Sequence, residues 1–212
     1  MSAAERSGSR ERPPSPVAGI VLAAGRSVRM GRSKALLPVD GETFVESAVE
    51  TLRRGGCGTV IVVVPPDGEH GDRLRSLVEE AGARVVTNPD PESEQIDSLR
   101  AGLKAIGSGP VAAVVLPVDF PLAGPGVVAR LIQSFHERGA PIVRPVYHAQ
   151  PGHPVLFARD VWDELMEAGL EQGAREVIHR HHAEIRDVPV DDRGVTVDVD
   201  TPDDYEREVV GE

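Results

Sequence analysis

The sequence predicts a single α/β domain in which helices cover both faces of a mostly parallel β-sheet. Short apolar runs rich in valine alternate with segments whose apolar residues recur at helical spacing, which is the pattern of such a three-layer domain. The chain has 212 residues, 40% of them hydrophobic, enough for one domain with a full core. Residues 1–16 are rich in serine, arginine, glutamate and proline, so we expect a disordered tail there and the domain over residues 17–212.

Strands and helices alternate regularly as far as residue 147. Apolar runs predict strands over residues 17–23, 59–64, 84–87, 112–116 and 141–147. Helical spacing predicts helices over residues 43–54, 72–81, 97–106 and 126–138. Beyond residue 147, the run 155–157 is too short for a core strand, and the alternation over 195–199 predicts an edge strand. Two short helices are predicted over 159–169 and 173–182.

Charge and composition argue against several classes of protein. A net charge of −11 disfavours nucleic-acid binding through a broad basic surface, and 3% aromatic residues disfavour a base-stacking platform. No apolar run reaches the roughly 18 residues of a membrane span. The N-terminal residues lack the apolar stretch of a secretory signal, and the single cysteine, Cys57, cannot form an internal disulfide. We therefore expect a soluble, cytoplasmic protein.

The segment that follows the first predicted strand, 22-LAAGRSVRMGRSK-34, carries four cations within nine residues. Ligands of open α/β sheets bind beyond the carboxyl ends of the strands, where this segment lies. The small residues from Ala23 to Gly25 would let backbone N–H groups approach an anion. The spacing fits neither a Walker A loop nor the G-x-G-x-x-G of a dinucleotide site. Lys34 is one of only two lysines in an arginine-rich chain, which suggests that a compact ammonium group is needed at a phosphate.

Two groups of carboxylates follow predicted strands. Asp119 follows the run 112–116, and a carboxylate beside a polyphosphate needs a cation such as Mg²⁺ between them. A helix cap is the alternative for Asp119. In 198-DVDTPDD-204, alternation would place Asp198 and Asp200 on one face of a strand. The alternative is a helix start at Thr201-Pro202, with Asp203 and Asp204 as capping charges.

The motif L-A-A-G-x-S-x-R-M-G-x-x-K, followed by L-L-P, resembles the signature of the sugar-nucleotide-type nucleotidyltransferases. It is most similar to the branch that contains molybdenum cofactor cytidylyltransferase and guanylyltransferase. The resemblance covers about residues 17–208 and implies the three-layer, Rossmann-like fold of nucleotide-diphospho-sugar transferases. It implies that Arg29 and Lys34 hold phosphates and act in catalysis, and that Asp119 and Asp200 bind Mg²⁺. It also implies that the nucleotide contacts the first loop through Leu22, Ala23, Ala24, Gly25 and Ser27.

The resemblance places the nucleobase near Ser98 and the acceptor near 152-GHPVLF-157. Ser98 could instead serve only as a helix-terminus hydrogen bond, and Asn88, which we also expect in the nucleotide pocket, could belong only to a turn. The branch commonly has Gly-Met where this chain has Gln95-Ile96, which leaves the base and the acceptor open. Acceptor contacts are expected from Gly152, His153 and Pro154. The histidines at 179, 181 and 182 lack the cysteines of a zinc site, so we interpret them as a solvated or acceptor-proximal helix end.

The function implied by the resemblance is Mg²⁺-dependent transfer of NMP from an NTP, with CTP favoured, to a phosphorylated acceptor with release of pyrophosphate. The expected acceptor is molybdopterin carrying molybdenum. The alternatives are a sugar phosphate or another phosphorylated acceptor, and a non-catalytic protein that binds the molybdenum cofactor. The expected partners are the NTP, the acceptor and a molybdoenzyme or its chaperone, with no nucleic acid and no membrane. We expect a monomer or a weak dimer.

Overall fold

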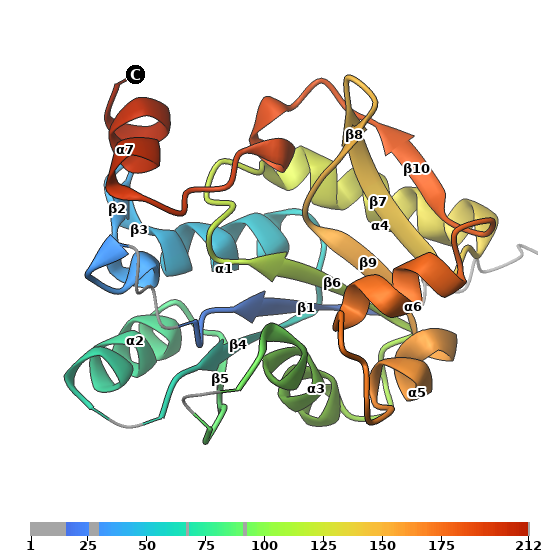
Figure 1. Cartoon of the computed structure of the whole chain (residues 1–212), viewed down its shortest axis with the longest axis horizontal. Helices are drawn as coiled ribbons and strands as arrows, with labels where there is room; N and C mark the ends of the chain where they lie inside the picture. The colour runs from blue at the N-terminus through green and yellow to red at the C-terminus, as the bar shows by residue number, and fades with distance from the viewer. Residues whose placement is uncertain (1–15, 26–29, 67, 91–92, 212) are drawn as a thin grey trace, which may run out of the picture.

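The computed structural model describes residues 16–25, 30–66, 68–90 and 93–211. Its main sheet has eight strands in the order β10-β7-β9-β6-β1-β4-β5, with β8 paired to β7 (Figure 1). These strands are β1 (Val17–Leu22), β4 (Thr59–Val64), β5 (Arg84–Thr87), β6 (Ala112–Pro117), β7 (Ile142–Tyr147), β8 (Gln150–Pro151), β9 (Val155–Ala158) and β10 (Arg186–Pro189). The predicted α/β fold with a mostly parallel sheet is confirmed. Residues 1–15, nearly all of the predicted tail, lie outside the described residues.

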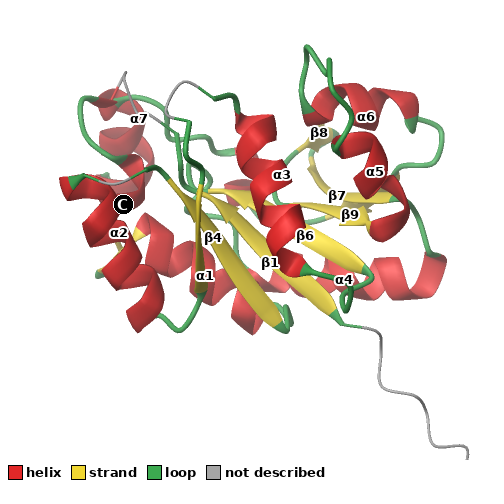
Figure 2. Cartoon of the chain, turned by 90° about the horizontal axis from the view of Figure 1, so that it is seen from below, coloured by secondary structure: helices red, strands yellow, loops and turns green. Residues whose placement is uncertain are grey.

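Helices cover both faces of the sheet, and Figure 2 shows the strands between the two helical layers. The larger hydrophobic cluster joins one face to α1 (Phe44–Arg54), α2 (Glu69–Glu80) and α4 (Pro125–Arg138). The second cluster joins the other face to α3 (Gln95–Ile106), α5 (Trp162–Leu165) and α6 (Ala174–Arg180). The smaller elements are β2 (Pro38–Val39), β3 (Glu42–Thr43), α7 (Pro202–Tyr205), the 3-10 turns η2 (Lys34–Leu36), η3 (Arg159–Val161) and η4 (Arg193–Thr196), and the π-helical turn η5 (Glu206–Val210).

Burial on both faces explains the apolar composition of the central strands. All six residues of β1 and all six of β6 are buried, and β1 pairs in parallel with β4 on one side and with β6 on the other. A parallel strand covered by helices on both faces has no polar side to show. The carboxyl ends of β1, β4, β5 and β6 therefore come together at one edge of the sheet, and their loops supply the polar groups there.

Local signals set the ends of α1. The backbone N–H of Thr43 donates to the carboxylate of Glu46 at 2.8 Å, and the Thr43 hydroxyl accepts from the Glu46 N–H at 3.4 Å. This reciprocal capping satisfies two donors that the first helical turn leaves free. Beyond the helix, Gly56 has a φ of 104°, a conformation that favours glycine. The helix predicted over residues 43–54 is confirmed, with Thr43 as its cap.

The predictions for the last third of the chain need correction. The run 155–157 belongs to β9, a buried antiparallel strand between β6 and β7. A strand with a partner on each side is held by two sets of hydrogen bonds, so its short length did not prevent it from joining the core. The segment 195–199 is not an edge strand but the turn η4 and the chain after it, and the edge is β10, parallel to β7. The alternating valines of the segment 195–199 are buried, but they do not form a strand. The helix predicted over residues 159–169 is shorter than expected and consists of η3 and α5.

Among the described helices, none combines the length and the apolar composition that crossing a bilayer requires.

Close packing of α3 on the sheet depends on Gly102. A Cβ atom added there would lie 2.8 Å from Ile20 Cγ2 and 3.3 Å from Val63 Cγ2. We predict that Gly102→Ala lowers the free energy of unfolding by about 1–2 kcal/mol, because overpacking outweighs the roughly 1 kcal/mol of helix propensity that alanine brings. Gly126→Ala on α4 is the matched control, since no described atom lies within 4 Å of its added Cβ. Urea denaturation should show that control equal to or above wild type, and a Gly102→Ala protein of undiminished stability would contradict the packing argument.

Candidate nucleotide and metal site

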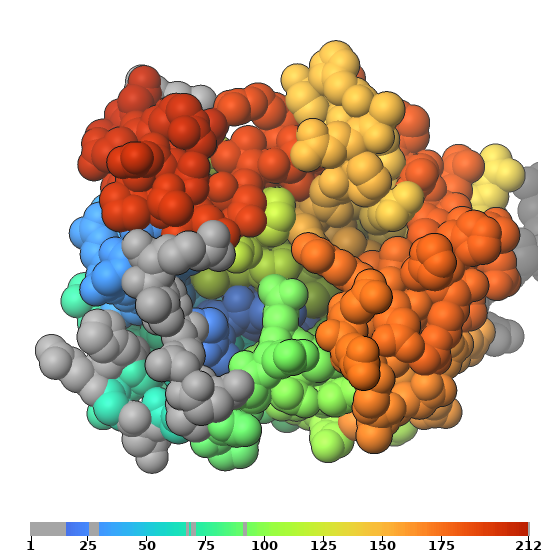
Figure 3. Space-filling view, in the orientation of Figure 1, coloured from blue at the N-terminus to red at the C-terminus, as the bar shows by residue number. Residues whose placement is uncertain are grey.

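A cavity of about 370 Å³ lies at the carboxyl ends of β1 and β6, beside the N-terminus of α3. Figure 3 shows the molecule hollowed beside the green segment that begins α3. The first loop, the β6 loop, the start of α3 and the segment before α7 contribute to the cavity wall, which includes Leu22, Ala23, Ala24, Gly25, Lys34, Ser98, Asp119 and Asp200. The structure therefore brings together eight of the predicted site residues that come from four separate parts of the chain.

The first loop leaves β1 with its backbone held in place and one side open. The N–H of Ala23 donates to the Val63 carbonyl at 2.9 Å, so pairing with β4 continues past the end of β1. No described atom lies within 4 Å of a Cβ built on Gly25, so the cavity is open at this position. A small residue here leaves backbone N–H groups accessible to an anion. Ser27 and Arg29, which we also expect in this loop, lie outside the described residues.

Lys34 is the cation at the centre of the cavity wall. It begins the turn η2, and the N–H of Leu37 donates to its carbonyl at 2.9 Å. Its residue is only 9% exposed, and its ammonium group donates to the Asp200 carboxylate and lies 3.7 Å from Oδ2 of Asp119. A buried ammonium needs such partners, because an unpaired charge in this position would be costly.

Asp119 follows β6 at the floor of the cavity. The N–H of Val118 donates to the Leu22 carbonyl at 3.1 Å, which ties the ends of β6 and β1 together just before Asp119. Burial raises the pKa of Asp119, and the nearby Lys34 ammonium partly opposes this effect. Among the described residues its Oδ1 atom is buried and has no hydrogen-bond partner. A desolvated oxygen without a hydrogen-bond donor is well suited to serve as a ligand of a metal cation.

Three carboxylates converge beside Lys34. Asp119, Asp198 and Asp200 each offer an oxygen within 4.8 Å of the others. The N–H of Val199 donates to the Asp119 carbonyl at 2.9 Å, so the segment before α7 is fixed directly against the β6 loop. Oxygen ligands grouped in this way suit a hard divalent cation. Sequence reasoning selected Asp200 but not Asp198 as a ligand, although the D-x-D spacing was the available signal.

Asp204, which follows the carboxylate cluster in the sequence, has a structural role at the start of α7. The Thr201 hydroxyl donates to Oδ2 of Asp204 at 2.7 Å, and the Asp204 N–H donates to the same hydroxyl at 3.2 Å. These hydrogen bonds from Thr201, followed by one from Arg207, lower the pKa of Asp204 to about 2. Asp204 is thus the capping charge of α7, as predicted.

Ser98 lines the cavity, and Asn88 lies directly behind it. Ser98 is on the cavity wall, whereas Asn88 is 4% exposed and sits behind it at the end of β5. The Asn88 side-chain amide donates to the Ser98 hydroxyl at 3.0 Å. We expected Asn88 itself to face the nucleotide pocket, and the structure places it behind the wall, because its amide is used by neighbouring protein groups.

A second cavity, of about 430 Å³, adjoins the first and shares Leu22, Glu94, Gln95 and Pro117 with it. Gly152 and His153 line this cavity, while Pro154 is buried and lies outside its wall. We expected Gly152 to allow close approach of a ligand. A Cβ there would instead lie 2.1 Å from the Val195 carbonyl oxygen, so the glycine is required for packing against η4.

The His153 ring lies between the second cavity and the β6 loop. It packs on Phe120 with ring centroids 4.5 Å apart, and its Nδ1 is buried without a hydrogen-bond partner among the described residues. Burial, followed by the charge of Arg175, lowers the pKa of His153 to about 4. The ring is therefore neutral at pH 7.

Comparison with known proteins agrees with this geometry. Residues 19–185 match the family model described as the MobA-like NTP transferase domain. The chain belongs to this family. The MobA-like domain of this chain is therefore that of a nucleotidyltransferase.

Two curated relatives match most of the chain. It is 24% identical over 189 residues to the molybdenum cofactor cytidylyltransferase of Escherichia coli, covering 88% of this chain and 92% of the relative. It is 31% identical over 205 residues to the 2-C-methyl-D-erythritol 4-phosphate cytidylyltransferase of Rhodococcus jostii, covering 93% and 87%. A solved structure of Rv0371c from Mycobacterium tuberculosis, in complex with manganese, is 28% identical with a TM-score of 0.77, covering 93% of this chain and 100% of that one.

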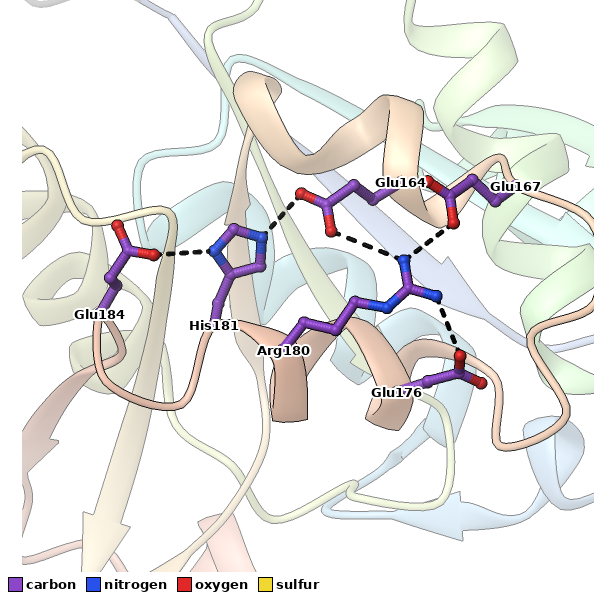
Figure 4. Close-up of polar contacts among 6 residues, drawn as sticks. All are labelled: Glu164, Glu167, Glu176, Arg180, His181 and Glu184. Carbon is purple, nitrogen blue, oxygen red and sulfur yellow. Dashed lines mark hydrogen bonds and ion pairs between the residues drawn. The ribbon is translucent and has the colours of Figure 1, made fainter.

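The wall of the second cavity in this MobA-like domain is braced by an ionic network between α5 and α6 (Figure 4). His181 contacts Glu164 at 2.7 Å and Glu184 at 3.2 Å. Arg180 contacts Glu167 at 2.8 Å and Glu176 at 2.9 Å. Within the described chain, the three histidines at 179, 181 and 182 do not form a metal-ligand cluster. The network instead fixes α6, which contributes Ala174, Arg175 and Ile178 to the cavity.

The neutral state of His153 predicts a specific acid sensitivity. An unfolded chain protonates this imidazole near 6.5, whereas the folded ring stays neutral down to about 4. Between these pH values the unfolded state binds more protons, so acidification favours unfolding. We predict that His153→Gln flattens the fall in unfolding free energy from pH 6.5 to 4, by at most about 1.4 kcal/mol per pH unit. Urea denaturation across this range measures it, with the exposed His136→Gln as control. Identical slopes for wild type and His153→Gln would contradict the assignment.

Proposed function

We propose that this protein transfers NMP from a Mg²⁺-bound NTP, with CTP favoured, to the terminal phosphate of molybdopterin carrying molybdenum, and releases pyrophosphate. The observation that carries the proposal is that Lys34, Asp119 and Asp200 lie together in the wall of the first cavity, where Asp198 completes a cluster of three carboxylates. A second cavity adjoins the first. A cation and a metal cluster are what a triphosphate needs, and a second cavity provides room for an acceptor. The E. coli relative, a molybdenum cofactor cytidylyltransferase, supports the choice of acceptor and base.

The chain's residues fit a divalent cation. Among the described residues, no donor reaches the buried Oδ1 of Asp119, and Asp198 and Asp200 complete a set of hard oxygen ligands. The structural relative in complex with manganese supports divalent metal use, and we propose that Mg²⁺ is the ion in this chain. Bound there, Mg²⁺ would neutralise phosphate charge and help to orient the triphosphate.

The protein's own groups would bind the triphosphate and stabilise the charge that develops during the reaction. Backbone N–H groups of Ala24 and Gly25 and the Lys34 ammonium would hold the triphosphate beside Leu22 and Ala23, with Arg29 and Ser27 as further proposed contacts. Lys34 would exchange part of its contact with Asp200 for phosphate oxygens and stabilise the charge that develops on pyrophosphate. The acceptor phosphate is itself an anionic nucleophile, so attack on the α-phosphorus needs positioning more than a strong base. His153, which is neutral and lines the second cavity, would contact the acceptor there.

A second acceptor class deserves a direct test. The Rhodococcus jostii relative acts, by its name, on a phosphorylated polyol, and this chain matches 87% of its length. A sugar or polyol phosphate is therefore the alternative acceptor, and a non-catalytic cofactor-binding protein is the alternative of a different class. Pyrophosphate release measured across CTP, GTP, ATP and UTP with each acceptor separates these possibilities. Thermal stabilisation by none of the four NTPs would favour the non-catalytic protein.

The proposal extends to the setting of the reaction. Since it consumes an NTP, we propose that it takes place in the cytoplasm, on a monomer or weak dimer, with a molybdoenzyme or its chaperone as the recipient of the product.

The two lysines of the chain provide a matched test of the mechanism. We predict that Lys34→Ala lowers pyrophosphate release by about 100-fold or more, because it removes the cation that faces the developing charge. Asp119→Ala should cause a loss of the same order by removing a metal ligand. Lys104→Ala, which changes an exposed residue on α3, should keep wild-type turnover. Circular dichroism would verify folding, and near-normal turnover of Lys34→Ala or Asp119→Ala would overturn the mechanism.

A further inference from the structure

Asn88, the only asparagine in the chain, is buried beside the nucleotide cavity without lining it. We infer that Asn88 is a positioning residue that makes Ser98 a hydrogen-bond donor toward the nucleobase, so that the site selects a base presenting an acceptor atom at this point. The inference rests on the proposed function, because it assigns the base end of the same site. The evidence for it is the three hydrogen bonds that the Asn88 side-chain amide makes.

The orientation of the Asn88 amide is fixed by the backbone. The N–H of Asp90 donates to Oδ1 of Asn88 at 3.3 Å. Turning the amide over would place its NH₂ group against that N–H, two donors facing each other. The main chain is held as well, because the Asn88 N–H donates to the Val64 carbonyl at 2.9 Å. Nδ2 therefore has to point toward the serine hydroxyls.

Both hydrogens of Nδ2 are used. One is donated to the Ser93 hydroxyl at 2.7 Å and the other to the Ser98 hydroxyl at 3.0 Å. The Ser93 hydroxyl donates its own hydrogen bond to the Asp90 carbonyl at 2.7 Å, so its hydrogen is already used. Among the described residues, the Ser98 hydroxyl hydrogen has no acceptor. Ser98 lines the cavity, so this hydrogen is available to a ligand there.

The direction of this hydrogen bond has chemical consequences for the ligand. Ser98 is 6% exposed and Asn88 4%, so water can compensate little for a mismatched pair. A carbonyl oxygen or unprotonated ring nitrogen satisfies the Ser98 hydrogen. An exocyclic amino group in the same place would leave two donors facing each other. The pyrimidine carbonyl next to the glycosidic bond is an acceptor of the required kind, in agreement with the proposed preference for CTP.

Asn88→Asp tests the inference with almost no change in shape. The carboxylate cannot donate, so the Ser98 hydroxyl turns toward it and presents lone pairs to the cavity. At pH 8 we expect the Kd of Mg²⁺–CTP, measured by isothermal titration calorimetry, to rise about tenfold or more. The Kd of ribose 5-triphosphate, which lacks a base, should stay at the wild-type value. Where a thermal melt shows that Asn88→Asp is unfolded, Asn88→Ala takes its place, because it removes the donor without adding charge.

A double-mutant cycle separates positioning from a general structural effect. Ser98→Ala should weaken CTP binding to a similar extent, and adding Asn88→Asp to it should produce no further loss. Ser76→Ala, on the exposed face of α2, is the control for serine truncation and should bind as wild type does. Wild-type CTP affinity in Asn88→Asp, equal losses with and without the Ser98 hydroxyl, or loss of ribose 5-triphosphate binding would each overturn the inference. A wild-type protein that binds no NTP would instead overturn the proposed function.

Discussion

The site depends on one contact: the buried ammonium of Lys34 against carboxylates that arrive from two distant parts of the chain. Lys34 begins the turn after the first loop, Asp119 follows β6, and Asp200 precedes α7. The Val199 N–H joins the last two at the Asp119 carbonyl, and Lys34 joins both to the first loop. Ligand groups are thus gathered at the sheet edge before any ligand arrives.

This arrangement holds opposite charges together in a setting where each alone would be unfavourable. Burial raises the pKa of Asp119, so its charge depends on a cation nearby. Lys34 provides that cation in the protein described here, and a divalent ion could share the task with it in the proposed complex. Other polar groups lie around this centre: the neutral His153 borders the proposed acceptor cavity, and the oriented Asn88–Ser98 pair borders the proposed nucleotide cavity.

Sequence patterns were sufficient to predict the strands and helices where the structure is regular. The parallel strands and their covering helices follow from periodicity, and the edge of the sheet that holds Lys34, Asp119 and Ser98 follows from strand direction. The C-terminal third resisted prediction, because β9 is stabilised by the strands on both sides of it and not by its own length. The valines after Gly194 alternate as in a strand but are buried along an irregular path. Asp198 was missed for the same reason, since its place in the cluster depends on the Val199 contact with the Asp119 backbone.

The most direct test of the account is the binding of Mn²⁺ to the apoprotein and its CTP complex, measured by electron paramagnetic resonance. The account predicts one tightly bound ion in the presence of CTP, and at least a tenfold weaker affinity in Asp198→Asn, whose carboxylate belongs to the cluster. Asp203→Asn, in the first turn of α7 and outside the cluster, should bind Mn²⁺ as wild type does. Wild-type Mn²⁺ affinity in the Asp198→Asn protein would contradict the placement of the metal among these three carboxylates.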